Sequence, residues 1–155
     1  MSNVLFFLIL FNSSIDTCNI HSTPTSYDSI VSYHSLGKRQ KLFFNKEKER
    51  ISEYFIKIKV LSKKDGRKIL SSLELDNSYD NFFISSSMVD FGIAFYKDGK
   101  VVNFFSFNSK DFNFSSSIEF SPLGRMRISS GSPDYFLNPI LTRSTIKMLL
   151  NKINK

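Results

Sequence analysis

The most constraining feature of the sequence is the stretch over residues 91–130, in which apolar and polar residues alternate in short segments. Asp98-Gly99 lies between the first two segments and Pro122-Leu123-Gly124 between the last two. Alternation with a period of two is typical of half-buried strands, and Asp-Gly between such runs is typical of a tight hairpin. We therefore predict an antiparallel meander, with Gly99 and Gly124 as structural residues of its turns. Its predicted strands are residues 91–96, 101–107, 116–121 and 125–129.

Large residues on both faces of residues 101–107 indicate a central strand that is covered on both sides, one of them by a helix. A short C-terminal helix is predicted over residues 142–154. Lys147, Lys152 and Lys155 occupy its polar face. Its apolar face is expected to consist of Ile146, Leu149, Leu150 and Ile153.

Residues 46–64 fit two periodicities. Ile51, Phe55, Ile58 and Leu61 recur at helical spacing, whereas apolar and lysine residues alternate over residues 56–60 as in a strand. Three features favour the helix. Charged residues precede the four apolar residues at helical spacing, Asn45 can serve as N-cap, and Asp65-Gly66 is typical of a helix end. The rival interpretation is a hairpin that pairs residues 54–61 with residues 68–75.

The remaining segments complete the expected domain organisation. Residues 69–75 and 82–89 are predicted strands, and residues 76–81 a turn. Residues 12–44 are rich in Ser and Thr and are expected to form a loosely structured connection, with a short strand or a turn of helix as the alternative for residues 27–36. Residues 1–11, with eight consecutive large apolar residues at 4–11, resemble a signal or anchor segment that is too short to span a bilayer. The predicted fold class is α+β, an N-terminal apolar segment and a helix packed on the antiparallel meander, within a single globular domain over residues 45–155.

The formal net charge of +7 is concentrated in one segment. Residues 38–68 contain twelve Lys or Arg and four acidic residues, a net charge of +8, so the rest of the chain is close to neutral. An acidic protein, anionic lipid headgroups or a solvated amphipathic segment each fit such an excess. Nucleic acid is the less favoured partner, because the aromatic residues follow the alternation of a buried face and no RNA-binding motif is present.

No arrangement of residues typical of catalysis or cofactor binding occurs in the sequence. Cys18 is the single cysteine, and His21 and His34 have no carboxylates around them in the pattern of a metal site. The Lys97-Asp98-Gly99-Lys100 run fits a hairpin turn and not a phosphate-binding loop. We therefore expect a protein that is not an enzyme and has no cofactor or metal.

Two segments are similar to the minor pseudopilins of type II secretion and the minor type IV pilins. Gly92-Ile93-Ala94-Phe95 is followed by a glycine turn, and the run from Ile118 to Ile128 contains Ser121-Pro122-Leu123-Gly124-Arg125-Met126-Arg127. Upstream, residues 49–75 resemble the helix and following strand of that family. The family's apolar N-terminal helix is represented here only by residues 4–11.

The resemblance implies a non-enzymatic structural subunit of a secretion or pilus-type assembly, anchored through its N-terminus in a bacterial inner membrane. Its globular part would lie outside the cytoplasm, in the cell envelope, and would contact other pilin-like subunits or assembly-platform proteins. Arg125 and Arg127 are the candidate partner-contact residues. The alternative is an exported or membrane-tethered β-rich module of other descent that binds protein or lipid.

Overall fold

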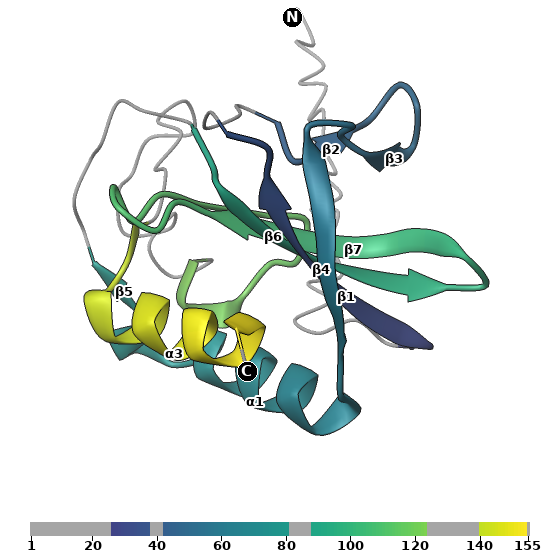
Figure 1. The fold of residues 1–155 in the computed structure, drawn as a ribbon. Helices are drawn as coiled ribbons and strands as arrows, with labels where there is room; N and C mark the ends of the chain where they lie inside the picture. Colours follow the sequence, from purple (N-terminus) through teal and green to yellow (C-terminus); the bar gives the residue numbers. More distant parts are fainter. Residues whose placement is uncertain (1–25, 38–41, 81–87, 124–139, 155) are drawn as a thin grey trace, which may run out of the picture.

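The computed structural model describes residues 26–37, 42–80, 88–123 and 140–154, which form an α+β fold (Figure 1). A five-stranded antiparallel sheet has the order β4-β1-β6-β7-β8. Its strands are β1 Ser29–Ser35, β4 Phe55–Leu61, β6 Phe91–Lys97, β7 Lys100–Phe107 and β8 Phe114–Ser116. The helices are α1 Lys63–Leu73, α3 Arg143–Asn154 and the short 3₁₀ helix η1 Asp76–Ser78. Two small ladders pair β2 Phe44–Asn45 with β3 Arg50–Ile51, and β5 Tyr79–Asp80 with β9 Ile140–Leu141.

The predicted hairpin at the start of the meander is confirmed. β6 and β7 are joined at Asp98 and Gly99, whose φ angles are 50° and 76°. Two consecutive residues with positive φ are what a tight hairpin turn of the type I′ family requires, and Asp-Gly supplies them at low cost. The central strand of the sheet is β6, with β7 next to it and also paired on both sides.

The second half of the meander differs from the prediction. The strand expected at residues 116–121 is wrong, because β8 ends at Ser116 and residues 121–123 are helical. Local side-chain hydrogen bonds end the strand: the Ile118 N–H donates to Ser116 Oγ at 2.9 Å, and the Phe104 N–H donates to Ser117 Oγ at 2.9 Å. The strand expected at residues 125–129 lies outside the described residues, as does most of that expected at residues 82–89.

The helix predicted over residues 46–64 is wrong. Residues 46–49 form the turn between β2 and β3, in which the Lys48 N–H donates to Asn45 Oδ1 at 3.0 Å and Glu49 has a φ of 47°. The expected N-cap residue therefore stabilises a turn. The rival hairpin placed β4 correctly, but the strand expected at residues 69–75 is wrong, because residues 69–73 form the end of α1.

Helix α1 begins where two side chains cap it. Ser62 Oγ accepts from the Asp65 N–H at 3.0 Å and donates to Asp65 Oδ2 at 2.7 Å, a reciprocal arrangement that satisfies a free N–H of the first turn. Ile69, Leu70 and Leu73 then form the buried stripe of the helix. Leu70 and Leu73, which were expected to alternate as in a strand, thus lie on the buried face of a helix.

Strand β1 corrects the expectation of a loose connection for part of residues 12–44 and confirms the alternative of a short strand within residues 27–36. Residues 29–35 of this supposedly loose connection lie inside the sheet, paired with β4 on one side and β6 on the other. Ile30 and Ser32 are fully buried. Phe43, from the same range, is also buried and belongs to a second hydrophobic cluster.

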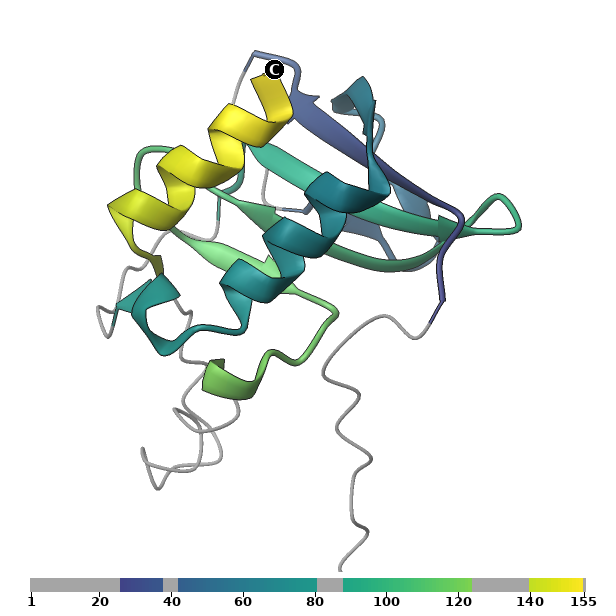
Figure 2. The same cartoon turned by 90° about the horizontal axis from the view of Figure 1, so that it is seen from below.

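Two hydrophobic clusters lie on opposite faces of the sheet. Helices α1 and α3 lie side by side over one face, where they enclose the main core (Figure 2). The prediction of a C-terminal helix is confirmed: Ile146, Leu149 and Ile153 are buried in that core, and Leu150 is half-buried against it. The smaller cluster on the other face is built from Phe43, Phe55, Val89 and Ala94.

Candidate functional site

The open side of β4 is the feature of the described residues that is best suited to binding. β4 stands at one end of the sheet order, paired with β1 on one side and with no described strand on the other (Figure 1). Ile56, Ile58 and Val60 are 48%, 38% and 55% exposed. We call the unpaired side of residues 55–61 the β4 edge. Unpaired backbone N–H and C=O groups together with exposed β-branched side chains form a template for a further strand.

A bulge in the middle of β4 determines which way its lysines point. Ser32 is paired with Lys59 and Tyr33 with Lys57, so Ile58 is an additional residue with no counterpart on β1. Paired residues share a face of the sheet, and successive residues of β1 point to opposite faces. Lys59 therefore lies on the helix-covered face with Ser32, and Lys57 on the other face with Tyr33.

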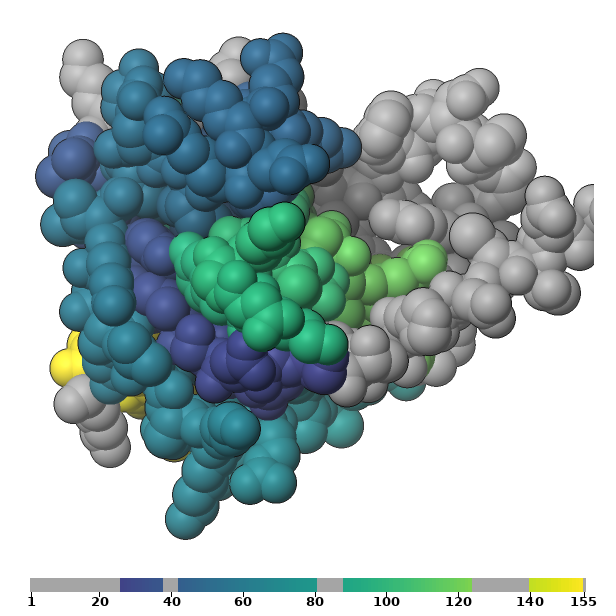
Figure 3. Space-filling model, turned by 90° about the vertical axis from the view of Figure 1, so that its right-hand side faces the viewer, coloured from purple at the N-terminus to yellow at the C-terminus, as the bar shows by residue number. Residues whose placement is uncertain are grey.

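The exposed apolar strip continues past the start of β4. Leu36 and Tyr54 are 55% and 54% exposed, and the Leu36 N–H donates to the Tyr54 carbonyl oxygen at 2.7 Å. In Figure 3 the chain around β4, in teal, forms the left margin of the molecule next to β1 in purple. The strip therefore extends along one border of the sheet.

Positive charge is concentrated in β4 and in the first part of α1. Lys57, Lys63, Lys64 and Arg67 are exposed, and Lys59 is half-buried. None of these five cations forms an ion pair with another described residue. The edge is thus both apolar and basic.

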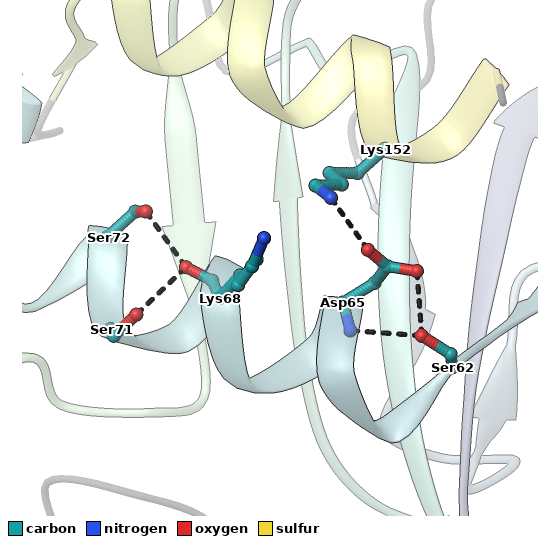
Figure 4. A network of polar contacts seen from close by, with 6 residues as sticks. All are labelled: Ser62, Asp65, Lys68, Ser71, Ser72 and Lys152. Atoms are coloured by element: carbon teal, nitrogen blue, oxygen red, sulfur yellow. Dashed lines mark hydrogen bonds and ion pairs between the residues drawn. The ribbon is translucent and has the colours of Figure 1, made fainter.

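Asp65, the first acidic residue after β4, is already engaged. Its Oδ1 accepts from Lys152 Nζ of α3 at 2.7 Å, and its other oxygen accepts from Ser62 (Figure 4). The hydrogen bond from Lys152, and then that from Ser62, hold the pKa of the Asp65 carboxyl below its usual value. Asp65 therefore joins α1 to α3, and the charge of Lys59 of β4 also lowers its pKa, as a smaller cause than the two hydrogen bonds.

This ion pair predicts a pH-dependent difference between wild type and Asp65→Asn. Because the pKa of Asp65 is lowered in the folded state, its contribution is complete above the unfolded value of 3.8 and is lost as the pH falls through the folded value. The variant should melt at a lower temperature than wild type at about pH 7, and the difference should shrink as the pH falls through the lowered pKa of Asp65. Thermal unfolding followed by circular dichroism at several pH values measures both.

Glu53→Gln is the matched control. Its carboxylate lies 3.8 Å from the Arg50 guanidinium with both side chains more than half exposed, so its removal should barely change the melting temperature. An equal loss in the two variants would refute the assigned role of Asp65.

The other polar features of the described residues serve the fold. Tyr33 and Tyr96 share a hydrogen bond of 2.5 Å between their hydroxyl oxygens, and burial, then this contact, raises the pKa of Tyr33. Burial, followed by the charge of Glu74, raises the pKa of Tyr79, whose hydroxyl donates to the Leu73 carbonyl oxygen at 2.8 Å. Tyr33 and Tyr79 are therefore neutral hydrogen-bonding groups at physiological pH.

No metal or membrane feature emerges from the described part of the chain. No group of three His, Cys, Asp or Glu residues in it is placed to hold a metal ion. None of the helices in it has the length and apolar character needed to cross a bilayer.

The structure places only one of the residues that the sequence singled out. Gly99 lies in the β6–β7 turn as expected, whereas Gly124, Arg125 and Arg127 lie outside the described residues. The β4 edge was not predicted as a site. The pattern Ser62-x-x-Asp65 is typical of a helix N-terminus and would have indicated that residues 55–61 precede the helix.

Comparisons with known proteins give no relative for this fold or site. No protein-family model, curated protein or solved structure matches the chain.

Proposed function

We propose that this chain is a non-enzymatic binding module that accepts an extended segment of another protein as an additional strand along the β4 edge. The observation that carries the proposal is a strand of seven residues that has no described strand on one side and three exposed β-branched side chains. Backbone hydrogen bonds would supply affinity in this mode of recognition, and the side chains of Ile56, Ile58 and Val60 would supply contact area.

A second copy of the chain is the less suitable occupant. Antiparallel pairing of two β4 edges would bring Lys57 and Lys59 of one chain beside the same lysines of the other, and β4 has no acidic residue to separate them. Like charges brought together on paired strands destabilise the pair. Lysines and a bulge on an edge strand are also features that oppose association between identical edges. The occupant that fits is therefore a segment of a different protein.

The narrower hypothesis of a pilin-like subunit stays a prediction. The segments expected to anchor it and to contact its partners, residues 4–11 and 125–127, lie outside the described residues. The order of helix and then strand expected over residues 49–75 is reversed, since β4 precedes α1. The proposal made here corresponds to the alternative of a β-rich module that binds protein.

Peptides with alternate backbone N-methylation test strand addition directly. We would use three fluorescent probes, Thr-Val-Thr-Xaa-Xaa-Thr-Val-Thr, in which the central pair is Gln-Gln, Glu-Glu or Lys-Lys. In a paired strand the backbone N–H groups of alternate residues point towards the neighbouring strand. Methylation of these backbone nitrogens should abolish binding, whereas methylation of the nitrogens of the residues between them should not. Fluorescence anisotropy with the full chain measures both.

The proposal requires this dependence on the methylated set for at least one of the three probes. If every probe binds equally well whichever set is methylated, or if none binds, the β4 edge does not accept a strand and the proposal is wrong.

A further inference from the structure

We infer that the segment that pairs with β4 is acidic and carries two adjacent carboxylates opposite the Ile58 bulge. This inference rests on the proposed function and specifies the chemistry of its partner. It follows from the arrangement of the lysines along the edge and at the start of α1.

The two lysines of β4 define where the carboxylates must lie. Lys57 and Lys59 flank the bulged Ile58 and lie on opposite faces of the sheet, as their partners Tyr33 and Ser32 require. In an added strand, two successive residues also point to opposite faces. A pair of adjacent Asp or Glu residues can therefore meet one lysine on each face, which a carboxylate pair two residues apart cannot do.

The first turn of α1 also favours a partner segment with negative charge. Lys63 and Lys64 open the helix directly after β4, and both are exposed. Cations at a helix N-terminus are unfavourable because the helix dipole places positive potential there. The only acidic residue in that turn is Asp65, which is engaged by Lys152. An acidic segment next to this end of β4 would be attracted both by the lysines and by the helix terminus.

A polypeptide fits this surface better than a membrane does. Anionic lipid headgroups would also be attracted to the cations, but they would make no use of the unpaired backbone of β4. The exposed apolar residues lie along a strand edge, where side chains of an added strand can pack beside them.

The affinities of the Gln-Gln, Glu-Glu and Lys-Lys probes show whether the β4 edge prefers an acidic, a neutral or a basic segment. The Glu-Glu probe should bind about tenfold more tightly than the Gln-Gln probe, and the Lys-Lys probe more weakly than both. The difference should largely disappear at about 1 M NaCl, where the Debye length is about 3 Å.

Charge reversal at one lysine tests the location. Lys57→Glu should remove the preference for the Glu-Glu probe, whereas Lys110→Glu, the same change at an exposed lysine beyond β7 on the far side of the sheet, should leave it unchanged. Circular dichroism would show that both variants are folded. An equal effect of the two substitutions would mean that net charge, and not the β4 edge, sets the preference.

The outcomes separate the two proposals. If all three probes bind equally and each depends on which set of residues is methylated, the partner is not acidic, although strand addition stands. If only the Glu-Glu probe binds and methylation has no effect, charge alone drives binding and both proposals fail. If phosphatidylserine vesicles bind in a manner that Lys57→Glu abolishes, while no peptide shows the methylation effect, the surface belongs to a membrane and both proposals are wrong.

Discussion

Phe105→Ala should lower the free energy of unfolding by about 3–5 kcal/mol. Phe105 lies in β7 with no exposed surface, in the main core under the helices. Its ring is 6.2 Å from that of Phe95 and 5.8 Å from that of Phe114, measured between centroids. Truncation removes the contacts of a whole ring and leaves a cavity that rigid strands on both sides cannot fill. Urea unfolding followed by circular dichroism measures the change.

Val102→Ala on the same strand is the matched control. Val102 is 41% exposed and has no partner on β6, because the register of the two strands shifts between Phe95 and Tyr96. Its truncation should change the free energy of unfolding by less than about 0.5 kcal/mol. A cost below about 1 kcal/mol for Phe105→Ala would contradict the position assigned to this residue.

Gly92→Ala should lower the free energy of unfolding by about 1–3 kcal/mol, because the added methyl group has no space. Gly92 is buried in β6, and a Cβ atom there would overlap the ring of Phe43, which lies against it. Phe43 also contacts the rings of Tyr33 and Phe55, so it cannot move away without disturbing the second cluster. This glycine allows the segment before β2 to cover the sheet face closely.

A double-mutant cycle with Phe43→Ala identifies the cause. In the Phe43→Ala background the space over Gly92 is open, so the additional cost of Gly92→Ala should largely disappear. Strictly additive costs would show that the methyl group meets some other obstacle. Urea unfolding of the four proteins supplies the comparison.

The elements that are predicted correctly depend on residues close together in the sequence. The β6–β7 hairpin depends on Asp98-Gly99 and on alternation in the residues beside it, all within a short piece of chain. Helix α3 depends on the spacing of Ile146, Leu149 and Ile153. Both elements are determined by neighbours in sequence, and both are confirmed.

Residues 46–75 show where local periodicity fails. Ile51, Phe55, Ile58 and Leu61 have helical spacing by coincidence. Ile51 lies in β3, and the other three lie before, at and after the bulge of β4. The bulge changes the face on which later residues lie, so the strand pattern is also imperfect. The capping box at Ser62 resolves this ambiguity, since a helix that begins there leaves no room for one that continues across it.

The candidate site depends on strand order, which the local pattern does not encode. Ile56, Ile58 and Val60 are exposed residues of a strand at the end of the sheet, and the unpaired backbone beside them is set by that position. That position results from pairing with β1, a strand more than twenty residues earlier that has few apolar residues apart from Ile30 and Val31. Long-range pairing of this kind is not visible in the periodicity of either strand.

A nuclear magnetic resonance titration of the full chain, labelled with ¹⁵N, tests the central claim most directly. Addition of the Glu-Glu probe should shift the backbone amide signals of β4 most strongly, with smaller changes in β1 and at the start of α1. Amides of β8, at the opposite end of the sheet, should be unaffected. Shifts concentrated in β8 or α3, or no shifts in β4 at saturating probe, would contradict the assignment of the β4 edge as the binding site.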